Sequence, residues 1–281
     1  MPDIRFLLKV SRPRFWIYIF GPYIVGLIAG VENKTELLSL LYLLFGIYFL
    51  YPANLLIYGV NDIYDYETDK LNEKKIEYET LVTPERRYGL WLAIFVANFA
   101  FIDILLLGSL PVIISGVGFL FFSFYYSAPP IRAKTKPFLD SAFNVLYILP
   151  GVFSYALVTG SFPPTSLIVA GGLWTAAMHA YSAIPDIEAD RAAGLKTIAV
   201  LFGQRTTLIF CLILYIASAA LTYPYLGIVS IILGCVYTAM ILLSFVYKDR
   251  SGVFGIYKYF PLLNAASGFV LFWFVALAKF F

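Results

Sequence analysis

The chain has 281 residues, of which 61% are hydrophobic and 13% are charged, and its mean hydropathy is +0.82. A soluble domain carries about 25% charged residues, so this chain lacks the charge to cover itself in water. The composition excludes secreted, disordered and nucleic-acid-binding proteins, and a net charge of +3 is too small to indicate a polyanionic partner. The two cysteines, Cys211 and Cys235, lie in apolar runs and indicate neither a disulfide framework nor a metal cluster. We therefore expect an integral membrane protein with no nucleic-acid partner.

Nine apolar windows qualify as membrane-spanning helices. A span needs about 20 predominantly apolar residues, and polar residues, glycines and prolines mark the window ends. The windows are residues 14–30, 37–59, 87–107, 109–127, 139–158, 164–181, 204–222, 224–246 and 258–279. This pattern predicts an all-α protein in which nine transmembrane helices form one bundle around a central cavity, in a single domain over residues 1–281. The first window has no small-residue cleavage site, so we expect it to remain in the mature chain.

The basic residues predict the orientation of the chain. With a cytoplasmic N-terminus, every Lys and Arg except Lys34 and Lys279 falls on the cytoplasmic side of the nine helices. Cytoplasmic loops of membrane proteins carry an excess of Lys and Arg, and one helix more or fewer would scramble the pattern. We therefore expect nine spans, a cytoplasmic N-terminus and a C-terminus outside.

Acidic residues concentrate in two clusters on the cytoplasmic side. One is Asn61-Asp62-x-x-Asp65-x-x-x-Asp69 after the second window, and the other is Asp186-x-x-x-Asp190 after the sixth. Each cluster leaves a helix that is expected to run inward. The sequence therefore predicts a weak internal duplication, with two pseudo-repeated units of four helices plus one further helix, whose clusters face one cavity.

The spacing within each cluster predicts a shared function for its carboxylates. On a helix, Asp62, Asp65 and Asp69 share one face, as do Asp186 and Asp190. Crowded carboxylates repel one another unless a cation lies between them. Oxygen ligands suit Mg²⁺, which is commonly shared with substrate phosphates, and nearby basic side chains suit the remaining phosphate oxygens. A Mg²⁺-bound diphosphate is the expected occupant. The alternative is that these are solvated loop charges, but polar groups next to a bilayer are costly and usually functional.

The clusters and the loop Tyr126-Ser127-Ala128-Pro129-Pro130-Ile131-Arg132-Ala133-Lys134 resemble the motifs of the UbiA superfamily of intramembrane prenyltransferases. The resemblance spans nearly the whole chain and implies Mg²⁺-dependent transfer of a prenyl group from an isoprenyl diphosphate to a lipophilic acceptor from the bilayer. By motif match it assigns the metal to Asp62, Asp65, Asp69, Asp186 and Asp190, among which Asp65, Asp69 and Asp190 are the catalytic candidates. It assigns the diphosphate to Asn61, Arg132, Lys134 and Lys196.

One departure from the superfamily pattern bears on the acceptor. Quinone-type and tocopherol-type members often carry a Lys-Asp pair where this chain has Ser182-Ala183. Residues 179–191 and 51–60 are instead similar to the lycopene elongase branch, which adds five-carbon units to lycopene. This similarity implies dimethylallyl diphosphate as prenyl donor, a carotenoid as acceptor and a location in a prokaryotic cell membrane. A quinone or archaeal ether-lipid prenyltransferase is the alternative within the superfamily, and a non-catalytic isoprenoid carrier is the alternative of another class.

Four further side chains are candidates for lining the substrate cavity. Asn54 lies two turns before Asp62, and His179 two turns before Asp186. For His179, a hydrogen-bonded packing role is an equal alternative. The rings of Tyr126 and Tyr181 suit stabilisation of a carbocation, but an interfacial aromatic belt explains most of the tyrosines.

Overall fold

The computed structural model describes residues 3–69, 80–247 and 250–281, and within these ranges the regular structure is helical. The chain divides into two compact units, each of which is described by itself. Unit 1 comprises residues 1–132, 149–162 and 279–281, and unit 2 comprises residues 133–148 and 163–278. The expected helix over residues 139–158 is shared between the units.

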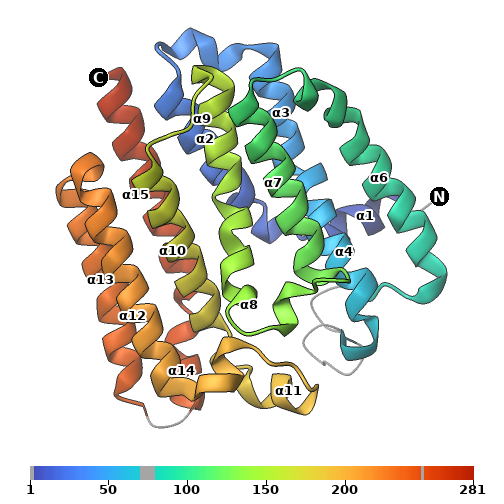
Figure 1. The fold of residues 1–281 in the computed structure, drawn as a ribbon, viewed down its shortest axis with the longest axis vertical. Helices are drawn as coiled ribbons and strands as arrows, with labels where there is room; N and C mark the ends of the chain where they lie inside the picture. Colours follow the sequence, from blue (N-terminus) through green and yellow to red (C-terminus); the bar gives the residue numbers. More distant parts are fainter. Residues whose placement is uncertain (1–2, 70–79, 248–249) are drawn as a thin grey trace. The chain divides into compact units, whose positions relative to one another are not determined.

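Unit 1 is built from α-helices with two short 3₁₀ turns (Figure 1). The α-helices are α1 (Ile4–Val10), α2 (Ile17–Gly30), α3 (Leu40–Leu50), α4 (Pro52–Asp69), α6 (Pro84–Leu106), α7 (Leu110–Ser127) and α9 (Leu149–Thr159), and the 3₁₀ turns are η1 (Pro13–Phe15) and η2 (Lys34–Leu38).

The core of unit 1 is aromatic. The ring of Phe49 lies 5.2 Å from Tyr23 and 5.3 Å from Phe119, measured between centroids, and the same distance separates it from Phe153. These side chains come from α2, α3, α7 and α9, and all four are buried. Aromatic contacts of this kind are each worth about 0.5–1.5 kcal/mol beyond area burial. They therefore fix the packing of α2, α3, α7 and α9 against one another.

Glycines bring α2 and α9 into close contact. A Cβ at Gly26 would lie 2.1 Å from the carbonyl oxygen of Gly151 and 2.5 Å from Ser154 Oγ. Ser154 Oγ also donates a hydrogen bond of 2.7 Å to the carbonyl of Tyr23. Small residues at such contacts are typical of helices packed within a membrane, where backbone proximity and polar bonds replace the hydrophobic effect.

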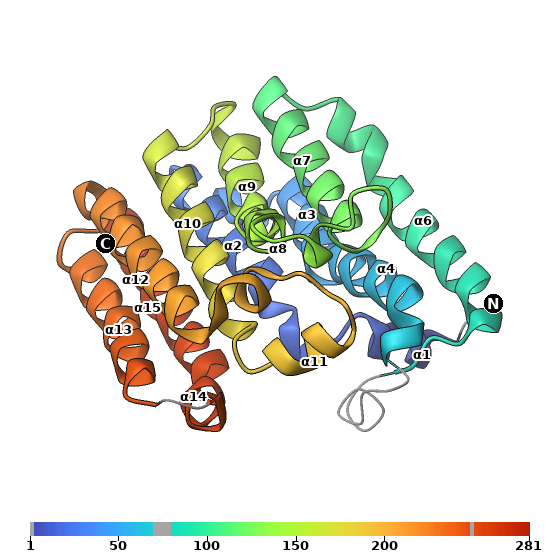
Figure 2. The same ribbon diagram turned by 60° about the horizontal axis from the view of Figure 1, so that its bottom comes forward.

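Unit 2 contains η3 (Ala133–Thr135), α8 (Leu139–Ala142), η4 (Phe143–Tyr147), α10 (Thr165–Ser182), α11 (Ile187–Ala192), α12 (Ile198–Leu226), α13 (Ile228–Phe245), α14 (Arg250–Tyr257) and α15 (Phe260–Phe280). Helix α10 packs against α12, and α12 packs against α13 (Figure 2). Their core holds Tyr215 stacked on Tyr237 with 4.7 Å between ring centroids, beside Tyr181 and Phe260.

Several helix boundaries differ from the expected windows. Helix α12 begins at Ile198, bends at Gly203 and continues through Pro224, so the expected boundary at residues 222–224 is wrong. The helix ends instead before Gly227, whose φ of +52° favours glycine. Proline is tolerated because it interrupts only one turn, close to the end of the helix. The window over 37–59 is likewise broken at Tyr51–Pro52, after which α4 runs on to Asp69.

Over the part of the chain that the structure describes, six helices are long and apolar enough to cross a membrane, or seven if the broken pair over residues 139–159 counts as one span. The six are Leu40–Tyr66, Pro84–Leu106, Leu110–Ser127, Ile198–Leu226, Ile228–Phe245 and Ser251–Phe280. The 14 residues of α2 would extend only about 21 Å along the helix axis, and α10 carries many small and polar residues. The protein is therefore an all-helical membrane protein, whereas nine spans and internal repeats remain predictions.

Candidate active site

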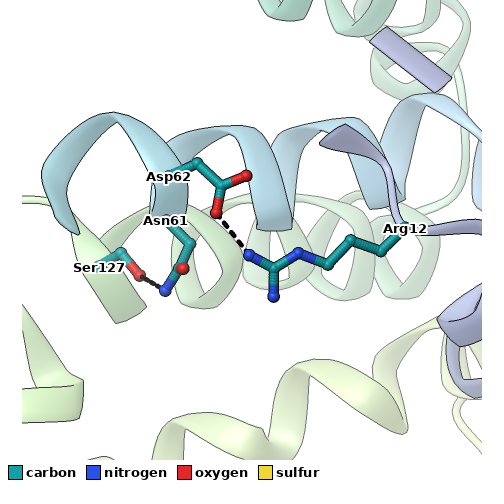
Figure 3. A network of polar contacts seen from close by, with 4 residues as sticks. All are labelled: Arg12, Asn61, Asp62 and Ser127. Atoms are coloured by element: carbon teal, nitrogen blue, oxygen red, sulfur yellow. Dashed lines mark hydrogen bonds and ion pairs between the residues drawn. The ribbon is translucent and has the colours of Figure 1, made fainter. Parts of the chain in front are cut away.

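The first aspartate cluster lies on α4, as its helical spacing predicts. Asp62 and Asp65 are both buried, with 3% and 8% of their surfaces exposed. Asn61 holds the helix to the end of α7 through a hydrogen bond of 3.1 Å from Nδ2 to Ser127 Oγ (Figure 3). Asp69 is the last residue of α4, but its side chain lies outside the described part of the structure. The helix therefore presents at least two carboxylates from one stretch of its surface.

Arg12 is a partner of the first aspartate cluster that the sequence does not single out. Its Nη2 lies 2.5 Å from Asp62 Oδ1 (Figure 3), and its guanidinium sits 4.8 Å from the ring centroid of Tyr58, one turn earlier on α4. Arg12 precedes η1 with a left-handed φ of +52°. Local sequence marks it only as one of several basic residues before the first apolar window. Its pairing with Asp62, fifty residues away, follows from the packing of unit 1.

Arg132, which the sequence assigns to the diphosphate, pairs with the second carboxylate of α4. Its Nη2 lies 3.3 Å from Asp65 Oδ1, and the arginine is more exposed than the carboxylate. Arg132 also adopts a left-handed φ of +45°, and its N–H donates to the carbonyl of Ala128 at 2.9 Å. This turn after the Pro129–Pro130 loop directs Arg132 back toward α4. Two arginines from separate segments thus neutralise two aspartates of one helix.

The second cluster lies in unit 2, at α11. Asp186 is exposed and precedes α11, and its carbonyl accepts the N–H of Asp190 at 2.8 Å, so the expected helical spacing is present. Burial, followed by the charge of Asp186, raises the pKa of the Asp190 carboxyl to about 6. Lys134 is near enough to lower this pKa in part. Lys196, the other predicted basic residue here, is exposed.

The predicted cavity-lining residues occupy varied environments within their own units. Asn54 is fully buried, and its Nδ2 donates to the carbonyls of Phe49 and Leu50, at the break between α3 and α4. Tyr181 is also fully buried, and its hydroxyl lies 2.9 Å from Ser244 Oγ. Tyr126 on α7 and His179 on α10 are half-buried. The contacts of Asn54 and Tyr181 give each a packing role, and their part in lining a substrate cavity stays a prediction.

The carboxylates fit a divalent cation chemically, although they do not form a closed ligand cage. Over the described residues, no three Asp, Glu, His or Cys side chains gather into one metal-binding group. Within unit 2, however, Asp186 and Asp190 repel each other enough to raise a pKa, and a bound cation would relieve that repulsion. Mg²⁺ usually keeps several waters and takes one or two carboxylates together with substrate phosphates. The residues therefore suit an open site that a phosphorylated substrate completes.

The fold and these residues define a helical membrane protein with acidic and basic side chains suited to a metal-bound phosphorylated ligand. Residues 19–251 match the UbiA prenyltransferase family. The chain is 38% identical over 276 residues to a lycopene elongase/hydratase of Haloarcula japonica, covering 95% of this chain and 90% of that protein. It is 36% identical to a lycopene elongase/hydratase of Halobacterium salinarum, covering 95% of each.

A solved structure shares the fold. It is a UbiA homolog from Archaeoglobus fulgidus bound to DMAPP and Mg²⁺, with a TM-score of 0.70 and 22% identity over 95% of this chain and 99% of that one. The match over residues 19–251 and the identity to the two haloarchaeal proteins place this chain in the UbiA prenyltransferase family. The protein is accordingly a membrane-embedded prenyltransferase of the lycopene elongase kind.

Proposed function

We propose that this enzyme transfers the dimethylallyl group of dimethylallyl diphosphate (DMAPP) to lycopene or a closely related carotenoid, in a Mg²⁺-dependent reaction. The observation that carries the proposal is that two aspartates of α4 are each paired with an arginine from another segment, Asp62 with Arg12 and Asp65 with Arg132. These pairs occur in a chain that is similar over 95% of its length to lycopene elongase/hydratases. The pairs provide both the anionic ligands and the cations that a metal diphosphate requires.

The role proposed for each residue follows from the chemistry of its side chain. The aspartates of α4 and α11 would hold Mg²⁺, which neutralises the diphosphate while its carbon–oxygen bond breaks. Arg132, Lys134 and Lys196 would contact phosphate oxygens, where an increasing negative charge on the leaving group strengthens each contact. Asn61 would support α4 in this arrangement, because its hydrogen bond to Ser127 fixes the helix against α7.

The prenyl acceptor is proposed to be a hydrocarbon because the arginines near α4 already have partners. Arg12 and Arg132 are paired with aspartates, and the guanidinium of Arg14 lies over the ring of Phe15 at 4.6 Å. A carboxylated aromatic acceptor needs a cation of its own in a low-dielectric site. A carotenoid needs only an apolar slot from which water is excluded, so that the allylic cation meets the electron-rich double bond before it meets water.

The proposed topology has nine crossings with the N-terminus and the active site in the cytoplasm and the C-terminus outside. It adds α2 and α10 to the seven segments that qualify by length and apolarity. The distribution of Lys and Arg supports it, because only Lys34 and Lys279 would then lie outside. Accessibility of cysteines introduced at position 34 and position 196 to a membrane-impermeant thiol reagent would test it, and labelling of both from the same side would contradict it.

Expression in a lycopene-producing bacterium tests the proposed reaction. Cells that carry the wild-type chain should accumulate carotenoids longer than lycopene by five-carbon units, detected by mass spectrometry. Asp65→Asn should leave lycopene unchanged, whereas the matched control Arg5→Ala, on an exposed position of α1, should retain the products. Unchanged lycopene together with prenylated quinone precursors or ether lipids would replace the carotenoid assignment. Binding of DMAPP with no product from any of these acceptors would indicate a carrier.

A further inference from the structure

Asp140 on α8 is a fully buried carboxylate for which the proposed chemistry has no use. It has no exposed surface. Its Oδ2 accepts a hydrogen bond of 2.7 Å from the N–H of Ile198, and its Oδ1 accepts one of 2.8 Å from the N–H of Ser141. The bond to Ile198 joins segments 58 residues apart in sequence. Because buried carboxylates are rarely retained without strong partners, this contact is a specific connection between α8 and the start of α12.

The residues next to Ile198 lead directly to the second aspartate cluster. Thr197 caps α12 by accepting the N–H of Val200 at 3.3 Å, and its hydroxyl donates to Asp190 Oδ2 at 3.4 Å. The N–H of Leu195 donates to the carbonyl of Asp190 at 2.9 Å. A short chain of bonds therefore runs from Asp140 through the start of α12 to the carboxylate of Asp190, all within unit 2.

A second contact holds the same segment to η3. The N–H of Lys196 lies 3.4 Å from the carbonyl oxygen of Thr135, next to Lys134 in sequence. Residues 193–197 connect α11 to α12. Lys196 within them is bound to η3, and Ile198 directly after them is bound to α8. Helix α11 has only six residues, and a helix this short is unstable in isolation. The position of α11 therefore depends on the two hydrogen-bond acceptors that hold the following segment, the carbonyl of Thr135 and the carboxylate of Asp140.

We infer that Asp140 is a positioning residue for the second aspartate cluster, where it holds residues 190–198 so that Asp190 and Lys196 meet the metal diphosphate together. This inference rests on the proposed function. Asp140 itself touches backbone N–H groups and not the reacting atoms. Its negative charge at the N-terminus of α12 strengthens the bond to Ile198, which fixes the segment more firmly than a neutral side chain would.

The test compares Asp140→Ala and Asp140→Asn with the control Asn264→Ala. Asp140→Ala leaves the buried N–H of Ile198 without its acceptor, and Asn264→Ala removes the acceptor of the Tyr237 hydroxyl in the same unit, 2.9 Å away. Both alanine variants thus lose a buried hydrogen-bond acceptor, but only Asp140→Ala loses it next to the segment that follows α11. Asp140→Asn keeps one acceptor oxygen and loses the charge, so it should lie between Asp140→Ala and the wild type.

Two readouts separate positioning from a general loss of stability. The first is amide hydrogen exchange of residues 186–200 in detergent without ligand. Asp140→Ala should accelerate this exchange roughly tenfold or more, because a buried N–H group would lose its hydrogen-bond acceptor. The second is the rise in unfolding temperature on addition of Mg²⁺ with DMAPP, which Asp140→Ala should largely lose. Asn264→Ala should lower the unfolding temperature but keep the wild-type exchange in residues 186–200 and the wild-type response to ligand.

The outcomes distinguish the inference from the function on which it rests. Unchanged exchange in Asp140→Ala overturns the inference, and so does faster exchange with the full response to Mg²⁺ and DMAPP, because Asp140 would then stabilise only the fold. Faster exchange of residues 186–200 together with a lost response to Mg²⁺ and DMAPP, in the Asp140 variants but not in Asn264→Ala, supports the inference. A wild-type protein that neither responds to Mg²⁺ with DMAPP nor forms product refutes the proposed function, a failure visible without any variant.

Discussion

Removal of Arg12 should reveal how strongly the buried carboxylate of Asp62 depends on this partner. The ion pair is largely removed from solvent, with 11% of the Arg12 side chain and 3% of the Asp62 side chain exposed. Breaking a buried ion pair by deleting one member typically costs about 3–5 kcal/mol. We expect Arg12→Ala to lower the free energy of unfolding by about 3 kcal/mol, at the low end of that range because Arg12 is close to the surface.

Unfolding in mixed micelles of a non-ionic detergent and dodecyl sulfate, followed by tryptophan fluorescence, measures this change. A double-mutant cycle with Asp62→Ala isolates the pair, and its coupling energy should be about 2 kcal/mol. Arg5→Ala is the matched control, because Arg5 lies exposed on α1, and should change the unfolding free energy by less than about 0.5 kcal/mol. Mg²⁺ should stabilise Arg12→Ala more than the wild type, since the metal would replace the lost positive charge.

Two results would refute this reasoning. A loss below about 1 kcal/mol for Arg12→Ala, the size of an exposed salt bridge, would show that Asp62 does not depend on Arg12. A coupling energy near zero in the cycle would show that the two side chains contribute independently, in conflict with their contact. If Mg²⁺ stabilised Arg12→Ala and the wild type equally, the proposed role of Asp62 as a metal ligand would be wrong, whatever the outcome for the ion pair.

Three further outcomes are expected. Asp65→Asn should reduce kcat by about 100-fold or more at saturating DMAPP while the protein still inserts and purifies, because it weakens a Mg²⁺ site with few direct ligands; near-normal turnover at limiting Mg²⁺ would exclude Asp65 as a ligand. Because the pKa of Asp190 is raised to about 6, the proton competes with the metal below that pH, and Mg²⁺ affinity measured by calorimetry should fall as the pH drops from 7 to 5; a flat profile would argue against this site. Gly26→Val should cost about 3 kcal/mol of stability, since its side chain would meet the backbone of Gly151, whereas Gly268→Ala, with open space around it, should be neutral in the same unfolding assay.

The sequence alone determined the class of protein and the local form of its first motif. Long apolar windows leave no alternative to membrane helices, because backbone polar groups in a bilayer must bond within the chain. The spacing of Asp62 and Asp65 predicted a common helix face, which α4 provides. The class depends on apolar windows of about 20 residues, and the shared face depends on spacing over a few residues. The order of amino acids carries both properties directly.

Helix ends were less predictable because the signals for them are weak in a membrane. Pro224 predicted a boundary, yet α12 continues through it to Leu226. Neighbouring helices and nearby hydroxyls can satisfy the backbone groups that a proline frees. The actual end depends on Gly227, whose left-handed backbone conformation is not distinguishable in sequence from that of a glycine inside a helix.

The tertiary structure alone decided which charges meet. Arg12 joins Asp62 across fifty residues, and Asp140 joins Ile198 across 58. Neither contact has a local sequence signature, because a buried charge takes whichever partner the packing of separate segments brings within hydrogen-bond distance. The sequence could therefore propose carboxylates for the site. Only the fold of each unit supplied the arginine that pairs with Asp62 and the buried aspartate that binds the segment next to Asp190.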